Sequence, residues 1–145
     1  MQNAMEAELR PIYENGETRA AEEATIRRAA NRWGVEYAKL PIQYRIDWAL
    51  LRDGKVAAWC ECKRRHNRQS KYSSLMLSLS KVTHGLELAS QTGLSFLVVV
   101  EWDDCLAYWK ADRISGVRIG GRVDRGDWQD VEPVVDIGIE LFVGL

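Results

Sequence analysis

Two acidic residues and a lysine, Asp47, Glu61 and Lys63, have the types and spacing of a metal-dependent hydrolytic site. Glu61 and Lys63 are separated by one residue in an apolar run typical of a β-strand, so they share one face of that strand. Carboxylate oxygens bind divalent ions, and a neighbouring ammonium can orient a water or neutralise charge on a phosphate. The three residues predict hydrolysis of phosphodiester bonds.

The position of Asp47 depends on a predicted hairpin. Residues 44–51 and 55–63 are rich in strand-forming side chains and flank Asp53-Gly54, a common turn sequence between antiparallel strands. Residue Asp47 lies on the first strand and Glu61 on the second. Whether the two carboxylates meet is therefore decided by the register of the hairpin.

The register has two alternatives. A two-residue turn would set Asp47 opposite Cys60, on the face that Glu61 does not occupy. A three-residue loop over residues 52–54, with Gly54 left-handed in a bulge, would pair Asp47 with Trp59 and place it diagonally across from Glu61. The metal-site hypothesis therefore predicts the bulged loop.

The arrangement resembles the PD-(D/E)XK nuclease superfamily, whose signature is an acidic residue, a hairpin and then Glu-x-Lys. Asp47 matches the first acid, and Glu61 and Lys63 match the Glu-x-Lys, while Ile46 stands where the signature has proline. The resemblance covers about residues 18–110. The superfamily includes junction-resolvase-like and phage-type members, which this chain resembles in size. It implies one domain over residues 1–145 with an α/β (α+β) restriction-endonuclease-like core. That core is a central mixed sheet flanked by helices, with extra strands in residues 111–145.

The family core usually begins with a helix that carries one more glutamate, and residues 20–33 supply it. Four apolar residues recur there at helical spacing, and Gly34 follows as a stop: Ile26, Ala29, Ala30 and Trp33. Both Glu22 and Glu23 lie near this stripe. The family pattern favours Glu23 as the additional catalytic acid, with Glu22 as the alternative. Either residue also fits an ordinary first-turn acid that compensates the helix dipole.

The resemblance implies a Mg²⁺ or Mn²⁺ ion bound by Asp47, Glu61 and the backbone carbonyl of Cys62. Such ions keep several waters that substrate oxygens can displace. Lys63 would orient or deprotonate the attacking water, or neutralise the transition state.

A basic segment follows Lys63 immediately. The whole chain has a formal net charge of -1, so its bulk charge does not identify a partner. The local cluster favours phosphate binding, because arginine and lysine supply salt-sensitive affinity for nucleic acid. A solvated loop is the ordinary alternative. The residues expected to bind nucleic acid are Arg64, Arg65, Arg68, Lys71 and Tyr72.

The second half of the chain predicts a long helix and further strands. Residues 70–89 carry an apolar stripe of Leu75, Leu79, Val82 and Leu86, with Ser70, Ser74, Ser78 and Lys81 on another face. This polar face is either solvated or beside a sugar-phosphate backbone. Residues 94–100 and 105–110 predict paired strands. Residues 114–123 predict a bent strand or irregular hairpin, and residues 131–143 a strand pair or edge extension.

Length and composition limit the classes of protein to which the chain can belong. The chain has 145 residues with 46% hydrophobic content, enough for one globular core. No apolar run is long enough to span a membrane, and residues 1–12 lack a signal-peptide pattern. An odd count of three cysteines favours a reducing compartment. We therefore expect a soluble protein of the cytoplasm, or of the host cytoplasm if phage-encoded.

Two of the cysteines raise an alternative metal site. Cys60 and Cys62, with His66, could suggest zinc, but structural zinc sites usually place two to four residues between cysteines. Their alternation with Glu61 along a strand instead predicts that both face the core.

Three classes of function follow. The first is a metal-dependent nuclease acting on DNA, with RNA left open, selective for branched DNA or ends in recombination, repair or phage replication. The second is an inactive nucleic-acid-binding protein of the same fold, and the third is a metal-free structural protein. The resemblance also implies a homodimer, because branch cutting usually needs two sites in one assembly.

Overall fold

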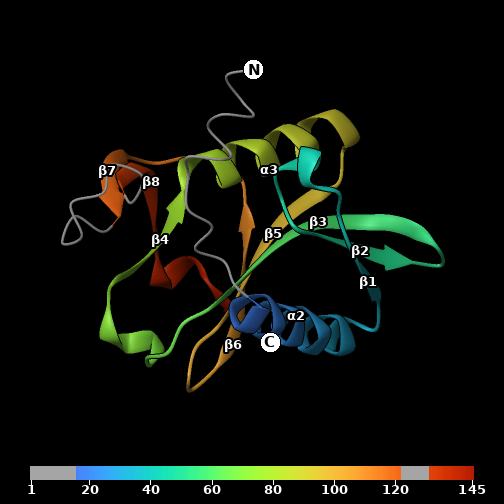
Figure 1. The fold of residues 1–145 in the computed structure, drawn as a ribbon, viewed down its shortest axis with the longest axis horizontal. Coiled ribbons are helices and arrows are strands. Elements are labelled where there is room, and N and C mark those ends of the chain that lie inside the picture. The colour runs from blue at the N-terminus through green and yellow to red at the C-terminus, as the bar shows by residue number, and fades with distance from the viewer. Residues whose placement is uncertain (1–15, 122–130) are drawn as a thin grey trace.

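The computed structural model describes residues 16–121 and 131–145. Within these ranges the larger sheet has six strands in the order β1-β2-β3-β5-β6-β9 (Figure 1). Strands β3 and β5 run parallel, whereas the other neighbours are antiparallel, so the predicted mixed sheet is confirmed. The strands are β1 Glu36–Lys39, β2 Trp48–Arg52, β3 Lys55–Arg64, β5 Ser95–Glu101, β6 Leu106–Ala111 and β9 Val143–Gly144.

Helix α2 (Gly16–Trp33) covers one face of this sheet with the predicted apolar stripe. Ile26 and Ala29 are buried in one cluster with Cys60 and Cys62 of β3. The apolar residues recur every three or four positions, so they form one side of the helix and pack together against the strands. The two cysteines therefore face the core, as predicted.

Helix α3 (Leu79–Thr92) lies on the opposite side of the sheet (Figure 1). Val82 is buried in a second cluster with Phe96 and Val98 of β5. The helix approaches the strand closely at Gly85, where a Cβ atom would lie 2.3 Å from the Phe96 ring. In the described part of the chain, neither helix is long and apolar enough to cross a membrane.

The turn between β2 and β3 differs from the prediction. Arg52 pairs with Lys55, and the two intervening residues, Asp53 and Gly54, have φ of 53° and 76°. Two successive positive φ values are typical of a type I′ turn, which matches the twist of the flanking strands. The predicted three-residue loop is therefore wrong.

A bulge farther along the hairpin places the two acids on the same face of the sheet. The register shifts midway along β2, and the pairing skips Ala57 of β3. Trp48 consequently pairs with Cys60, and one further step of this register sets Asp47 opposite Glu61. With a two-residue turn alone, Asp47 would lie opposite Cys60 and face away from Glu61. The one extra residue of the bulge moves Asp47 to the face that Glu61 occupies. The two acids therefore share a face because of a bulge within the strands, which the hairpin sequence did not indicate.

The segment before β2 is less extended than predicted. Residues 44–47 are not part of the strand, which begins at Trp48. A short 3-10 helix, η1 (Ile42–Tyr44), precedes it, and the Leu40 N–H donates to the Asp47 carbonyl at 2.8 Å. Asp47 is therefore the last residue of a loop that this hydrogen bond closes, directly before β2.

The helix predicted over residues 70–89 is wrong in its first half. Residues Ser74–Ser78 form strand β4, which belongs to a second sheet with the order β4-β8-β7. Leu75 and Leu77 are buried and Met76 between them is exposed, an alternation with the period of a strand. Pairing with β8 (Val131–Gly138), distant in sequence, decides this conformation.

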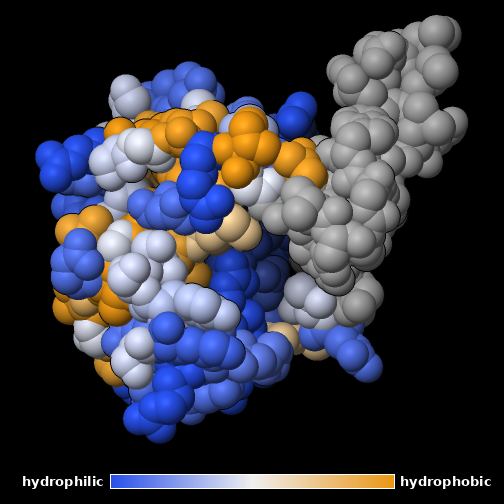
Figure 2. Space-filling model, turned by 90° about the vertical axis from the view of Figure 1, so that its left-hand side faces the viewer, coloured by the Kyte–Doolittle hydropathy of each residue, from blue (hydrophilic) through white to orange (hydrophobic). Residues whose placement is uncertain are grey.

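The predicted extra C-terminal strands are present. Besides β8, strand β7 (Val117–Gly121) completes the second sheet, and β9 extends the edge of the larger one beside β6. Val117 and Ile119 of β7 are exposed, and Figure 2 shows apolar residues gathered in the upper part of this side of the molecule. The last two residues of the segment predicted as a bent strand or irregular hairpin, 122 and 123, lie outside the described residues.

Candidate active site

Asp47 and Glu61 come together at the end of β2 nearest the loop. The Asp47 backbone N–H donates a hydrogen bond to Glu61 Oε1 at 3.1 Å. Glu61 is 1% exposed, and its Oε2 atom accepts no hydrogen bond from the described residues. A buried carboxylate oxygen without a donor is costly unless a cation is near it. The pair is therefore placed to share a positive charge.

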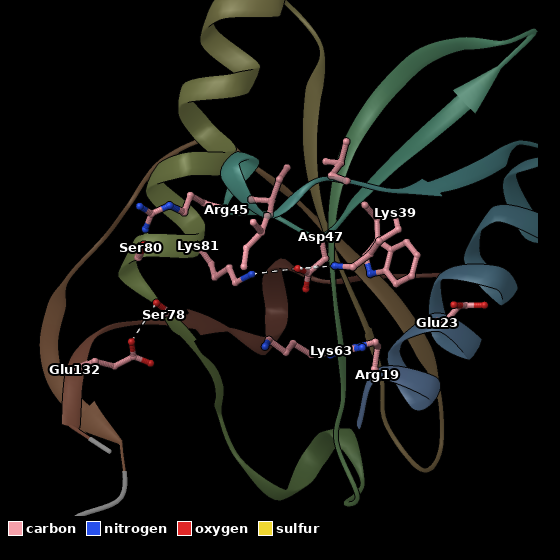
Figure 3. A pocket seen from close by; sticks show the side chains of 14 residues that line it. Arg19, Glu23, Lys39, Arg45, Asp47, Lys63, Ser78, Ser80, Lys81 and Glu132 are labelled. Atoms are coloured by element: carbon pink, nitrogen blue, oxygen red, sulfur yellow. Dashed lines mark hydrogen bonds and ion pairs between the residues drawn. The ribbon is translucent and has the colours of Figure 1, made fainter. Parts of the chain in front are cut away.

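Lys81 supplies a positive charge at this point. Its ammonium lies 3.3 Å from Asp47 Oδ1 (Figure 3). It also lies 3.6 Å from Glu61 Oε2. A second ammonium, that of Lys39 on β1, lies 3.1 Å from Asp47 Oδ1. Sequence reasoning did not assign Lys81 to the site, because it placed the residue midway along a helix from residue 70. In the structure Lys81 is in the first turn of α3, at the edge of the cleft.

The two acids differ in their electrostatics. Burial raises the pKa of Glu61 to about 8, and Lys81 only partly offsets it. Burial also raises the pKa of Asp47, but Lys81 and Lys39 outweigh burial, so this pKa lies below its ordinary value. At neutral pH Asp47 is ionised, while Glu61 retains its proton for much of the time.

The lysine of the Glu-x-Lys signature contacts the helix that carries the two candidate glutamates. Lys63 Nζ lies 3.9 Å from Glu22 Oε2, and Glu22 is 7% exposed. Glu23 also lines the cleft, but its carboxylate pairs with Arg27 at 3.2 Å, and Figure 3 shows it pointing away from Asp47. The structure thus brings Glu22, rather than Glu23, to Lys63.

The donor set fits a hard divalent ion. Asp47 and Glu61 offer carboxylate oxygens that converge on one point, which a cationic nitrogen occupies. Among the residues described, no group of three or more His, Cys, Asp or Glu side chains could hold a metal. Two carboxylates without a full protein cage suit an ion that keeps several waters, as Mg²⁺ does. Cys60 and Cys62 are buried on the other face, and His66 lies in an exposed loop.

A cleft of about 720 Å³ opens beside Asp47, which forms part of its lining. Its lining includes five cationic side chains from five separate parts of the fold: Arg19, Lys39, Arg45, Lys63 and Lys81. Figure 3 shows Lys39 and Lys81 reaching Asp47 from opposite sides. A concave surface with several positive charges beside an acidic pair suits a polyanion whose phosphate must reach those acids.

The basic segment after β3 contributes none of the residues that line this cleft. Arg64 pairs with Asp103 at 2.8 Å, and Arg68 pairs with Asp104 at 3.6 Å, so both contact the β5–β6 turn. Burial lowers the pKa of Arg65, which donates to the Met76 carbonyl.

The end of the same segment is more exposed. The Lys71 ammonium lies 5.5 Å from the centre of the Tyr72 ring, and this tyrosine is 59% exposed. The side chains expected to bind nucleic acid are therefore divided between intramolecular pairs and an exposed surface outside the cleft.

Comparison with known families identifies the chain. A family model described as "Phage putative PDDEXK endonuclease" matches residues 8–145. No curated protein matches the chain. The match spans the acidic pair, the Glu-x-Lys and both sheets, and the mixed sheet between two helices is consistent with a restriction-endonuclease-like fold. The chain belongs to this phage family of PD-(D/E)XK endonucleases.

Proposed function

We propose that this endonuclease hydrolyses DNA phosphodiester bonds with a divalent metal ion held by Asp47 and Glu61. The observation that supports this most is the convergence of both carboxylates on one cationic nitrogen inside a positively lined cleft. The Cys62 carbonyl, next to Glu61, is the proposed third ligand. When bound, Mg²⁺ or Mn²⁺ supplies polarisation of the phosphate and stabilisation of its developing charge.

The side chains around the metal ligands have separate proposed roles. Asp47, ionised at neutral pH, provides the permanent negative charge of the site, and Glu61 loses its proton when a cation is bound. Lys63 orients the attacking water or neutralises the transition state from the edge of the cleft. Glu22 positions Lys63 through their 3.9 Å ion pair.

The cleft favours recognition of DNA shape over sequence. Its cations suit phosphate oxygens, and phosphate contacts fix the position of a nucleic acid without reading its bases. Arg19 and Arg45 are suited to the backbone on either side of the cut bond. The exposed Lys71 and Tyr72 extend the contact beyond the cleft. We therefore propose selectivity for branched DNA or DNA ends, as in recombination, repair or phage replication.

A panel of labelled substrates tests this function. The purified protein is mixed with single-stranded, duplex, flap and four-way DNA, and with matching RNA, in Mg²⁺, Mn²⁺ or EDTA. We expect cleavage of flap or four-way DNA that stops in EDTA. Cleavage in EDTA would contradict the metal mechanism, and cleavage of duplex alone would contradict the branch preference. Tight binding without cleavage in any ion would favour the inactive DNA-binding protein instead.

Replacing the two adjacent glutamates of α2 separates their roles. Glu22→Gln is expected to lower the cleavage rate by about ten- to hundredfold, since the loss of an orienting partner has effects of this size. Glu23→Gln, the matched change one residue away, is expected to cleave near the wild-type rate because its carboxylate pairs with Arg27. Single-turnover rates with both folded variants give the comparison. A larger loss in Glu23→Gln would restore the assignment made from the family pattern.

A further inference from the structure

The ammonium of Lys81 occupies the point at which the two proposed metal ligands converge. It lies within 3.6 Å of one oxygen from each acid, whereas the lysine of the signature, Lys63, forms its ion pair with Glu22. We infer that Lys81 is a resident counter-cation of the metal-free site, which a divalent ion must displace before it binds both acids. This inference rests on the proposed function, because it concerns the same site.

The need for such a cation follows from burial. Glu61 is almost fully buried, and the Asp47 side chain is 17% exposed, so little water screens the two carboxyl groups from each other. Neighbouring buried carboxyl groups repel each other once both are ionised, unless a positive charge lies between them. Lys39 contacts Asp47 and lies over the Trp48 ring, 5.3 Å from its centre. Lys81 is the lysine that forms a described ion pair with both acids.

The ammonium and a metal ion compete for the same oxygens. Mg²⁺ binds carboxylate oxygens at about 2.0–2.1 Å and requires nearly ideal geometry. An ion held by Asp47 Oδ1 and Glu61 Oε2 would therefore take the place of the Lys81 nitrogen. The lysine stem can move outward, because the Lys81 side chain is 31% exposed and lines the open cleft beside Ser78 and Ser80. After displacement it remains among the cations of the cleft.

Metal affinity in the absence of DNA tests the inference without relying on cleavage. Calorimetric titration with Mn²⁺ compares the wild-type protein with Lys81→Met and Lys81→Gln, which remove the charge, and with Lys81→Arg, which keeps it. Removing a competing charge at this distance is expected to tighten Mn²⁺ binding by about tenfold or more. Lys81→Arg is expected to bind as weakly as the wild type. Lys55→Met, the same change at an exposed lysine of the hairpin, serves as the matched control.

The outcomes separate this inference from the proposed function. Tighter binding by both uncharged variants, with Lys81→Arg and Lys55→Met unchanged, supports the displacement of Lys81. Mn²⁺ binding that is equal or weaker in the folded uncharged variants overturns it while leaving the metal site intact. Equal tightening in Lys81→Arg overturns it as well, because the change would then be steric. If no form of the protein binds Mn²⁺, the proposed function fails and the inference fails with it.

Discussion

Replacing Glu61 with glutamine is expected to lower metal-dependent DNA cleavage by about a thousandfold or more, the scale seen when a group that stabilises transition-state charge is lost. Glutamine keeps the shape of the side chain, and its carbonyl oxygen can still accept the hydrogen bond from the Asp47 N–H. The negative charge that would bind the ion is lost. Cleavage rates and Mn²⁺ titration of the purified variant measure both effects.

The same substitution is expected to preserve or increase the stability of the metal-free protein. Glu61 is buried with an oxygen that no described donor satisfies, so its ionised form opposes folding. Lost activity with retained stability is typical of a residue kept for function. Glu36→Gln, on the exposed surface of β1, is the matched control and should resemble the wild type. Cleavage by Glu61→Gln within about tenfold of the wild type would contradict a role in binding the metal.

The metal-free protein is expected to lose stability as the pH rises from about 4.5 to about 8. Burial raises the pKa of Glu61 from 4.5 to about 8, so across this range the folded state holds a proton that the unfolded state has lost. The stabilisation is complete below the lower value and disappears above the upper one. At about 1.4 kcal/mol per pH unit, the loss amounts to several kcal/mol. Urea denaturation in EDTA at a series of pH values measures it.

Two comparisons isolate the contribution of Glu61 to this pH dependence. Glu61→Gln should flatten the profile between these pH values. The lowered pKa of Asp47 acts with the opposite sign and below this range, because its stabilisation is lost only as the pH falls through acid values. Divalent ions should stabilise the wild type more at high pH than at low pH, because they bind the ionised carboxylate. A wild-type profile as flat as that of Glu61→Gln would refute the raised pKa.

Local sequence patterns predicted most strands of the larger sheet and the buried faces of both helices. The stripe through Ile26 and Ala29, the apolar strand near residue 98 and the alternation at Cys60 and Cys62 all reflect burial on one known face of an element. Strand β4 was missed because Leu75, at helical spacing before Leu79, also fits the strand alternation with Leu77. The partner that decides between these periods, β8, lies more than fifty residues away.

The chain's own sequence determined which groups the candidate site offers: a carboxylate just before one strand, a second carboxylate on the adjoining strand and a lysine after it. Side-chain type and strand alternation are local properties. The tertiary structure decided which groups complete it. The bulge that sets Asp47 opposite Glu61, the arrival of Lys81 from α3 and the choice of Glu22 depend on register and on helix packing across the sheet. These relations join residues far apart in sequence, and a shift of one residue reverses which side chains meet.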